Sequence, residues 1–133
     1  MELLDAVRAA KRVYIIGNGG SYANAIHIAN DLISVGVRAF TVDPATLTAA
    51  ANDYGWYQGF VRWIKTVGEP GDLLIALSGS GKSPNILAAC ELAESMGLAV
   101  HREFGAAHGL DMQAAEEAQI HLGHELMRCL RKT

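Results

Sequence analysis

An uninterrupted apolar run that leads directly into a Gly/Ser loop is the feature that most constrains the fold of this chain. Residues 73–77 read Leu-Leu-Ile-Ala-Leu, and residues 78–83 read Ser-Gly-Ser-Gly-Lys-Ser. A short apolar run between turn residues is typical of a strand buried on both faces. Ser83 can cap a helix that begins there, and Pro84 suits its first turn. Hydroxyls, backbone N–H groups and the positive end of a helix dipole then meet in one loop, which predicts a phosphate site.

Two other interpretations of residues 78–83 remain open. One is a P-loop, because Gly-Lys-Ser at residues 81–83 matches the end of that motif. Its first glycine would fall on Ala76, however, and no obvious metal-binding acidic strand follows. The other is a plain strand-to-helix turn that is merely rich in glycine. We favour a hydroxyl-lined site for a phosphorylated small molecule, because the chain carries a second loop of similar kind at residues 17–21.

That earlier loop reads Gly-Asn-Gly-Gly-Ser and follows the apolar residues 13–16. It begins like a dinucleotide-binding fingerprint, and Asp43 ends the next predicted strand, where a ribose-binding acid would stand. The third glycine of the fingerprint is replaced by the bulky Tyr22 at the point where helix and strand should touch. We therefore expect no nucleotide cofactor.

Strands and helices are predicted to alternate along the chain. Apolar runs and helical periodicity predict strands over 13–16, 38–42, 73–77 and 98–100, and helices over 2–11, 22–35, 45–51, 56–67, 84–96 and 111–131, with turns or loops over 52–55 and 105–109. This rhythm indicates a parallel sheet with helices on both faces. Ligands of such sheets bind outside the carboxyl ends of the strands, so both Gly/Ser loops should belong to one site. The helix over 22–35 should bury Ala25, Ile26, Ala29 and Ile33.

Composition and charge exclude several classes of partner. Half of the 133 residues are hydrophobic and the formal net charge is −3, so the charge favours neither a nucleic acid nor a membrane surface as partner. No apolar run approaches the roughly 20 residues that span a bilayer. The first residues lack the basic start and apolar core of a signal peptide. Cys90 and Cys129 show no metal-type spacing, so we expect free thiols and a cytoplasmic location.

Three motifs together resemble the sugar isomerase (SIS) domain family. They are Gly-Asn-Gly-Gly-Ser at 17–21, Asn-Asp-Tyr-Gly at 52–55 and Ser-Gly-Ser-Gly-Lys-Ser at 78–83. Within that family the chain is most similar to the phosphoheptose isomerases, which convert sedoheptulose 7-phosphate into a heptose 7-phosphate. The likeness runs from about Val13 to Val100 and resumes in the last predicted helix. It implies a single SIS domain over residues 1–133, with an open, mostly parallel α/β sheet of four to five strands.

The resemblance also implies which residues bind the substrate. The Ser-rich loop holds the phosphate in the family, which assigns that role to Ser78, Gly79, Ser80 and Ser83, with the backbone of Gly81. Family members often carry Thr at the position of Gly79, so one hydroxyl is missing here. The remaining substrate-binding positions correspond to Asn18, Gly19, Gly20, Ser21, Asp53 and Glu116. Short polar side chains that donate and accept hydrogen bonds suit a polyol.

Two residue pairs correspond to the catalytic and metal positions of the phosphoheptose isomerases. The first pair is His27 and Asp31, which the i, i+4 spacing places on one helix face. The second is Glu116 and His124, with Glu117 as a neighbouring choice for the first of them. The resemblance implies that Asp31 and His124 act as base and acid and that all four residues bind zinc. Asp31 is the base, a metal ligand or both, and the sequence leaves these alternatives open.

The expected function is a phosphosugar aldose–ketose isomerase, acting on sedoheptulose 7-phosphate. The alternative is a SIS-type module that binds a sugar phosphate or bridges proteins without turnover. Two departures support this alternative: Asp31 replaces the Glu of the family, and the region between residue 101 and residue 110 is short. The resemblance implies a homo-oligomer, a dimer or a tetramer, although parts that build such contacts in relatives are missing.

Overall fold

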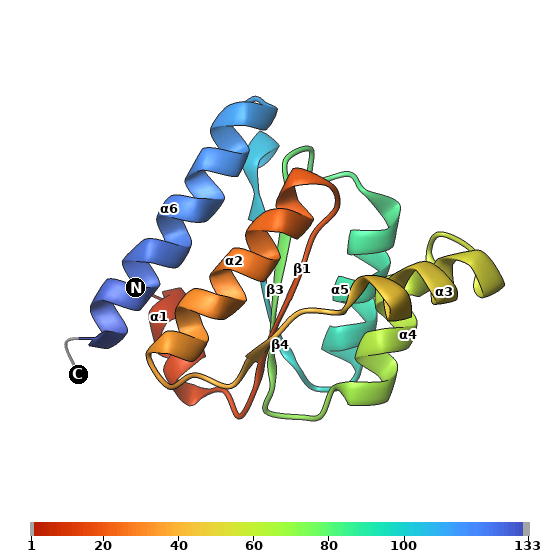
Figure 1. The fold of residues 1–133 in the computed structure, drawn as a ribbon, viewed down its shortest axis with the longest axis horizontal. Coiled ribbons are helices and arrows are strands. Elements are labelled where there is room, and N and C mark those ends of the chain that lie inside the picture. The colour runs from red at the N-terminus through yellow and green to blue at the C-terminus, as the bar shows by residue number, and fades with distance from the viewer. Residues whose placement is uncertain (1, 132–133) are drawn as a thin grey trace.

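The computed structural model describes residues 2–131 (Figure 1). Its elements in chain order are α1 (Glu2–Ala9), β1 (Val13–Ile16), α2 (Gly20–Ser34), β2 (Ala39–Phe40), α3 (Pro44–Tyr54), α4 (Gln58–Val67), β3 (Leu73–Ser78), α5 (Pro84–Ser95), β4 (Ala99–Phe104), the 3₁₀ helix η1 (Gly105–His108) and α6 (Met112–Arg131). None of the helices in this described range is long and apolar enough to cross a membrane.

One parallel sheet with strand order β2-β1-β3-β4 accounts for all the strands within residues 2–131. In register, Val13 of β1 lies beside Ala39 of β2 and Leu73 of β3, and β4 pairs with β3 over six residues. The direction in which successive strands are added reverses between β1 and β3. Ligands of open α/β sheets bind at such a point, outside the carboxyl ends of the two strands. The predicted fold class is confirmed.

Helices cover both faces of the sheet, as predicted. One core lies beneath α1, α2 and α6, where Ile15 and Ile75 of the sheet meet Leu126. The other lies beneath α4 and α5, where Ile16 meets Phe60. Figure 1 shows α2 and α6 side by side, and α3 projecting from the body on the side away from α6. The strands β1 and β3 are buried along their whole length, which explains their uninterrupted apolar sequences.

The segment after β1 differs from the prediction at two places. The strand expected over 38–42 is reduced to Ala39–Phe40, and the Thr41 side chain instead donates a hydrogen bond to the backbone oxygen of Ile15. The turn expected over 52–55 is wrong, because α3 continues to Tyr54 and ends at Gly55, which has a φ of 101°. Asp43 caps α3 by accepting from the backbone N–H of Thr46, so the start of this helix has a clear physical cause.

The last strand is longer than predicted. The expected strand over 98–100 is observed as β4, Ala99–Phe104, and the expected loop over 105–109 is largely the 3₁₀ helix η1. The prediction ended this strand at residue 100 because the next residues, His101-Arg102-Glu103, are polar. These side chains are tolerated because β4 is an edge strand, and His101 pairs with Glu103 at 2.9 Å along it.

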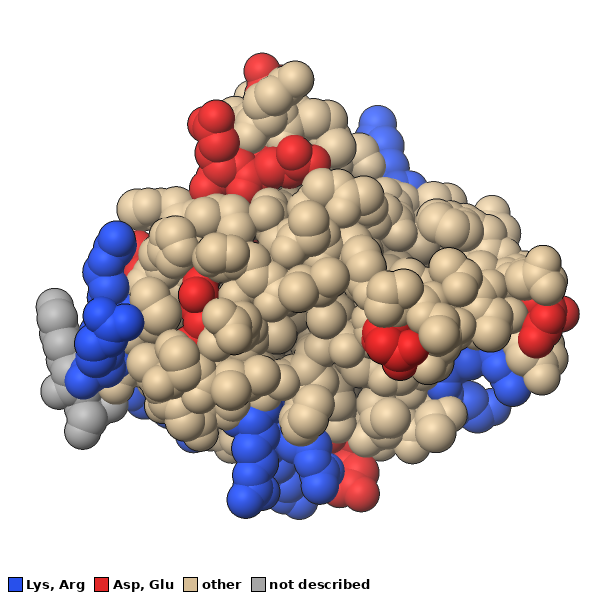
Figure 2. All heavy atoms as spheres, viewed as in Figure 1, with Lys and Arg blue, Asp and Glu red and all other residues tan. Residues whose placement is uncertain are grey.

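The buried face of α2 is only partly as predicted. Ala25 and Ala29 are buried, but Ile26 and Ile33 are 47% and 56% exposed, and Ile28 and Leu32 take their place in the core. Because α2 is apolar on both faces, its periodicity does not identify the inner one. Ala23, Ile26, Asn30 and Ile33 form an exposed row that we call the outer stripe of α2. The face that carries α2 is mostly uncharged (Figure 2).

Candidate functional site

The two Gly/Ser loops meet at the carboxyl edge of the sheet, as predicted. The first loop (residues 17–21) follows β1, and the second loop (residues 78–83) follows the adjacent β3. A pair of side-chain amides joins them: Asn18 Nδ2 donates to Asn85 Oδ1, and Asn85 Nδ2 donates to Asn18 Oδ1, each at 2.9 Å. Asn85 is buried in the first turn of α5 and also accepts from the backbone N–H of Ile86. Sequence reasoning missed Asn85, although it directly follows the Ser-Pro that starts α5.

Within the second loop, hydroxyl groups hold the backbone in shape. The Ser78 hydroxyl accepts from the backbone N–H of Gly81 at 2.9 Å, and the Ser80 hydroxyl accepts from the N–H of Lys82 at 3.1 Å. Ser83 occupies the N-cap position of α5, but its side chain makes no capping bond and lies 3.4 Å from the Ser78 hydroxyl oxygen. Ser83 therefore stands at the predicted cap position without making the capping hydrogen bond. The prediction that Pro84 lies at the start of the helix is confirmed.

The N-terminal part of α6 packs closely onto the second loop. A Cβ atom at position 79 would meet the sulfur atom of Met112, which is the end of a flexible and exposed side chain that can move aside, so this contact does not require a glycine. Gly105 is more restricted, because a Cβ atom there would collide with the Cβ atom of Ala115 in α6.

The first loop is shaped by two glycines with different roles. Gly19 has a φ of 56°, in the left-handed region that favours glycine. Gly20 begins α2, and a Cβ atom there would collide with the carboxylate of Glu116. A carboxylate beside the first turn of a helix is stabilised by the helix dipole. Glu116 thus lies at the first loop, where it was expected to bind substrate, and its side chain is outside the His27–Asp31–His124 group that is described below.

A buried polar chain connects the first loop to α6. Gln119, which is 1% exposed, donates from Nε2 to the Ser21 hydroxyl at 3.0 Å. Asn24 donates from Nδ2 to Gln119 Oε1 at 2.8 Å and to the backbone oxygen of Glu116 at 3.0 Å. Sequence reasoning missed Gln119. The available signal was its place in the buried stripe of α6 with Ala115, where a polar residue needs a partner.

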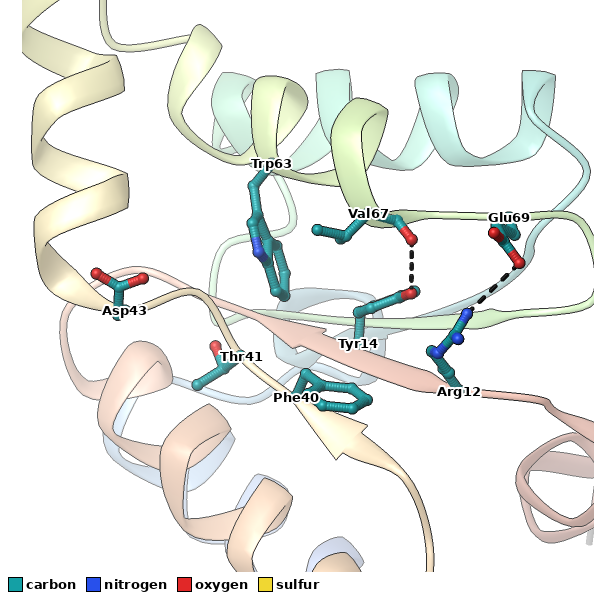
Figure 3. Close-up of a pocket in the computed structure, with 8 residues that line it drawn as sticks. All are labelled: Arg12, Tyr14, Phe40, Thr41, Asp43, Trp63, Val67 and Glu69. Carbon is teal, nitrogen blue, oxygen red and sulfur yellow. Dashed lines mark hydrogen bonds and ion pairs between the residues drawn. The ribbon is translucent and has the colours of Figure 1, made fainter.

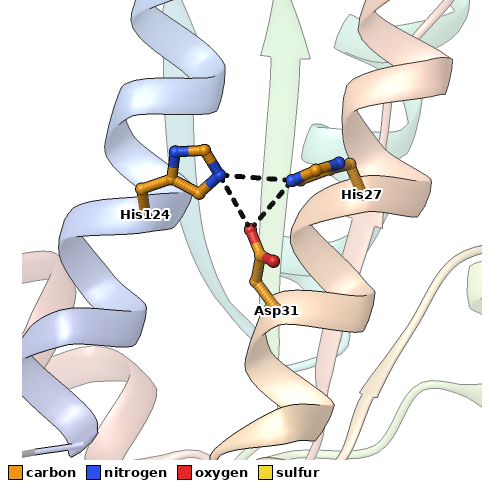
Figure 4. Close-up of side chains that lie close together, drawn as sticks. All are labelled: His27, Asp31 and His124. Atoms are coloured by element: carbon orange, nitrogen blue, oxygen red, sulfur yellow. Dashed lines mark hydrogen bonds and ion pairs between the residues drawn. The ribbon is translucent and has the colours of Figure 1, made fainter.

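His27, Asp31 and His124 come together between α2 and α6 (Figure 4). The two Nε2 atoms are 3.2 Å apart, and Asp31 Oδ2 lies 3.3 Å from His27 Nε2 and 3.7 Å from His124 Nε2. Asp31 is 8% exposed, and its Oδ2 is a buried oxygen without a hydrogen-bond partner. We call these three residues the triad.

The triad fits a metal ion. Ligand atoms about 2.0–2.1 Å from a tetrahedral zinc lie roughly 3.3–3.4 Å from one another, close to the three separations observed here. A cation would also satisfy the otherwise unpartnered Oδ2 of Asp31. Within residues 2–131, the ligand atoms of His27, Asp31 and His124 lie within 4.8 Å of one another, and Glu116 is not part of this group.

Asp53 is not seen to join these groups. It lies in the last turn of α3, where its carboxylate accepts from the neighbouring Asn52 amide at 3.1 Å. The helix α3 packs against α4 and has no buried residues of its own. The expected contact of Asp53 with the sugar therefore stays a prediction. Glu117 is exposed beside Glu116 in an open cleft of about 450 Å³.

A cavity of about 480 Å³ lies between β2 and α4 (Figure 3). Trp63, Phe40 and Tyr14 line it, and Asp43 stands at one end. Asp43 is the residue that a dinucleotide fingerprint would use for the ribose. Its carboxylate instead accepts the backbone N–H and the hydroxyl of Thr46, and these hydrogen bonds lower the pKa of Asp43.

Comparisons with known proteins agree with this geometry. Residues 2–101 match the SIS domain family. A phosphoheptose isomerase from Akkermansia muciniphila is 43% identical over 102 residues, which cover 71% of this chain and 54% of the relative. One from Bradyrhizobium sp. BTAi1 is 39% identical over 119 residues, covering 84% and 60% of the two chains. The chain thus spans little more than half the length of these relatives. The phosphoheptose isomerase structure from Neisseria gonorrhoeae superimposes with a TM-score of 0.88 and 25% identity, covering 98% of this chain and 82% of that one.

Proposed function

Because this chain belongs to the SIS domain family, which matches residues 2–101, we propose that it is a phosphosugar aldose–ketose isomerase that acts on sedoheptulose 7-phosphate. The observation that carries the proposal is the meeting of the two Gly/Ser loops, joined by Asn18 and Asn85, beside a helix pair that holds two histidines and a carboxylate. The names of the relatives that cover more than two thirds of this chain support the choice of substrate.

The two loops are proposed to hold opposite ends of the substrate. The second loop receives the phosphate, because it offers the Ser80 and Ser83 hydroxyls and lies at the N-terminus of α5, where a helix dipole favours an anion. The first loop receives the polyol. Glu116 beside Gly20 supplies a carboxylate that accepts hydrogen bonds from sugar hydroxyl groups.

The triad is proposed to carry out the proton transfers. Asp31 removes the proton from the carbon next to the carbonyl, which leaves an enediolate. His124 gives a proton to the carbonyl oxygen and takes one from the neighbouring hydroxyl, and the proton held by Asp31 returns to the former carbonyl carbon. Each positioned acid or base contributes about 10²–10⁴-fold to the rate. The net reaction moves one carbonyl along the chain with no gain or loss of atoms.

Zinc is the metal that we propose for the triad, held by His27, Asp31 and His124. When bound, it supplies Lewis-acid polarisation of a substrate oxygen. A carboxylate that binds a metal is a weaker base, and a His124 Nε2 atom that binds a metal has no proton to give, so the metal-binding and proton-transfer roles compete at both Asp31 and His124. The Nε2 and Oδ2 atoms supply nitrogen and oxygen ligands of the kinds that zinc accepts.

We also propose that the protein forms a homo-oligomer through the outer stripe of α2. Ala23, Ile26, Asn30 and Ile33 follow the alternating spacing of three and four residues that characterises helix–helix seams. A central Asn in such a seam pairs with its own symmetry copy across a two-fold axis, which favours a second copy of this chain as the partner. The stripe lies on the same helix as His27 and Asp31.

An assay with sedoheptulose 7-phosphate tests the proposed function directly. The protein is incubated with the sugar phosphate, with and without added zinc, and the aldose product is measured. We expect turnover that increases with zinc. Tight binding of the sugar phosphate without any product would favour the alternative, a binding module that uses the same two loops.

A further inference from the structure

The Ser21 hydroxyl is part of a hydrogen-bond chain whose direction is fixed from its far end. The backbone oxygen of Glu116 can only accept hydrogen bonds, and the side-chain atom of Asn24 that lies 3.0 Å away must therefore be its NH₂ group. The same NH₂ group lies 2.8 Å from the amide of Gln119, so the Gln119 atom that faces it is the oxygen. The backbone thereby removes the usual ambiguity in amide orientation.

This direction determines the role of the Ser21 hydroxyl. With its oxygen committed to Asn24, Gln119 presents its NH₂ group to Ser21 Oγ at 3.0 Å. The Ser21 oxygen accepts this bond, and its own proton is available for donation. Among the hydrogen bonds formed within residues 2–131, none has Ser21 Oγ as the donor.

We propose that Gln119 is a positioning residue that holds Ser21 as a hydrogen-bond donor toward an acceptor oxygen of the ligand. The inference rests on the proposed function for the identity of that ligand, a phosphosugar bound at the first loop. Ser21 is 3% exposed and Gln119 is 1% exposed, so water competes little with the arrangement. A ligand that places a hydroxyl, carbonyl or phosphate oxygen there satisfies a buried donor. An ammonium group at the same place would meet a second donor and be rejected.

The isosteric variant Gln119→Glu tests the proposed polarity. Its carboxylate accepts from both Asn24 and Ser21, so the Ser21 hydroxyl turns away from the ligand. We expect the Kd for sedoheptulose 7-phosphate to rise about tenfold, as for the loss of one hydrogen bond. The neutral variant Gln119→Met should cost less, because Ser21 remains free to donate. The control Gln58→Glu adds the same charge in the first turn of α4, on a helix that takes no part in the proposed site, and should change Kd by less than about twofold.

A double-mutant cycle separates positioning from a merely structural role. In the Ser21→Ala background, Gln119→Glu should produce no further loss of affinity, because the hydroxyl that it redirects is gone. Additive losses in the double variant would overturn the proposal. Unchanged melting temperatures across the set establish that the fold is intact.

A measurement without ligand keeps this inference separate from the proposed function. In nuclear magnetic resonance spectra of the free protein, the Gln119 side-chain NH₂ protons should show cross-peaks to the Ser21 Hβ protons. NH₂ cross-peaks from Gln119 to Asn24 instead would show the reverse orientation and overturn the inference. If the cross-peaks are as expected but the wild-type protein does not bind sedoheptulose 7-phosphate, the proposed function fails. The conclusion that Ser21 accepts from Gln119 and is free to donate its own proton is then still supported.

Discussion

The side chains of Asn18 and Asn85 donate to one another's oxygens, both at 2.9 Å, although the two residues are 67 positions apart. This reciprocal pair joins the first loop to the first turn of α5. Asn18 therefore fixes the position of the first loop relative to the start of α5. Its amide keeps one N–H and one oxygen lone pair beyond the two bonds to Asn85, and its expected contact with the sugar stays a prediction.

Replacing Asn85 with Ala should destabilise the protein and loosen the site. The change leaves the Asn18 amide without its partner and removes one of the two acceptors of the Ile86 N–H, which keeps its bond to the backbone oxygen of Ser83 at 3.1 Å. The loss of the paired amides in a buried position should cost about 1–3 kcal/mol of unfolding free energy. Urea unfolding measures this loss, and a weaker affinity for sedoheptulose 7-phosphate should accompany it. The control Asn52→Ala removes an exposed amide and should stay within about 0.5 kcal/mol of wild type. Equal stability of the two variants would contradict the proposed coupling.

Replacing Ser80 with Ala should weaken binding without affecting stability. Ser80 is exposed, and its hydroxyl makes one hydrogen bond within the loop, to the N–H of Lys82. Calorimetric titration should show a Kd for sedoheptulose 7-phosphate that is about tenfold higher, because a hydrogen bond to a charged phosphate is lost. Ser95→Ala removes a hydroxyl of similar exposure at the end of α5 and serves as the control. An unchanged Kd in the Ser80 variant would remove this residue from the phosphate site.

Replacing Asp31 with Asn should separate binding from chemistry. The amide keeps the shape of the side chain but is neither a base nor a good metal ligand. We expect a rate about 10²–10⁴-fold lower, weaker zinc binding and a Kd for the sugar phosphate within about twofold of wild type. Steady-state kinetics, metal analysis and calorimetry measure the three effects. The same change at the exposed Asp5 of α1 is the control. A variant that kept the full rate would show that another group is the base.

Replacing Ile33 with Glu should disrupt the proposed oligomer. The side chain is 56% exposed in the single chain, so a charge there is solvated and the monomer fold should persist. A charge buried between two copies of α2 would be strongly unfavourable. Light scattering after gel filtration should show wild type as a multiple of the chain mass and the variant as a monomer. Thr48→Glu on α3 is the control. A wild-type protein that is already a monomer would rule out this interface.

Stability should fall at alkaline pH because of Tyr14. Burial, followed by the hydrogen bond to Asp72, raises the pKa of Tyr14 from 10.0 to about 12. The unfolded chain loses this proton first, so the stabilisation is complete below pH 10 and disappears as the pH rises toward 12. Tyr14→Phe should show a flatter stability curve over this range than wild type in urea unfolding. Tyr57→Phe, at an exposed position, should follow wild type, and a parallel decline in all three proteins would refute the assignment.

The sequence was sufficient for the features that local patterns encode. The strand over 73–77, the start of α5 at Pro84 and the presence of both Gly/Ser loops at one sheet edge follow from apolar runs, turn residues and chain topology. The i, i+4 spacing likewise places His27 and Asp31 on one helix face. His124 entered only through a resemblance, because nothing local connects it to residues that are nearly a hundred positions away.

Other features depend on tertiary contacts that no local pattern encodes. Gln119 and Asn85 are polar residues in helices, and their partners were visible only after the helices had been placed on the sheet. The local sequence likewise could not show whether Ile26 or Ile28 belongs to the core, because both faces of α2 are apolar. The polar sequence of β4 forms a strand because β4 lies at the edge of the sheet, where side chains such as Arg102 remain partly in contact with solvent. This edge position is not encoded in the local sequence.

The dependence of the site on α6 has a consequence for how the protein matures. The proposed metal ligands on α2 need His124 to complete the metal site, and the Ser21 hydroxyl needs Gln119 to orient it. Both residues belong to α6, which leaves the ribosome after all the strands of the sheet. A nascent chain that has folded only as far as β4 would therefore lack both these site residues and Leu126, which completes the core on that face of the sheet. Zinc binding by the triad would then indicate that α6 has packed against α2.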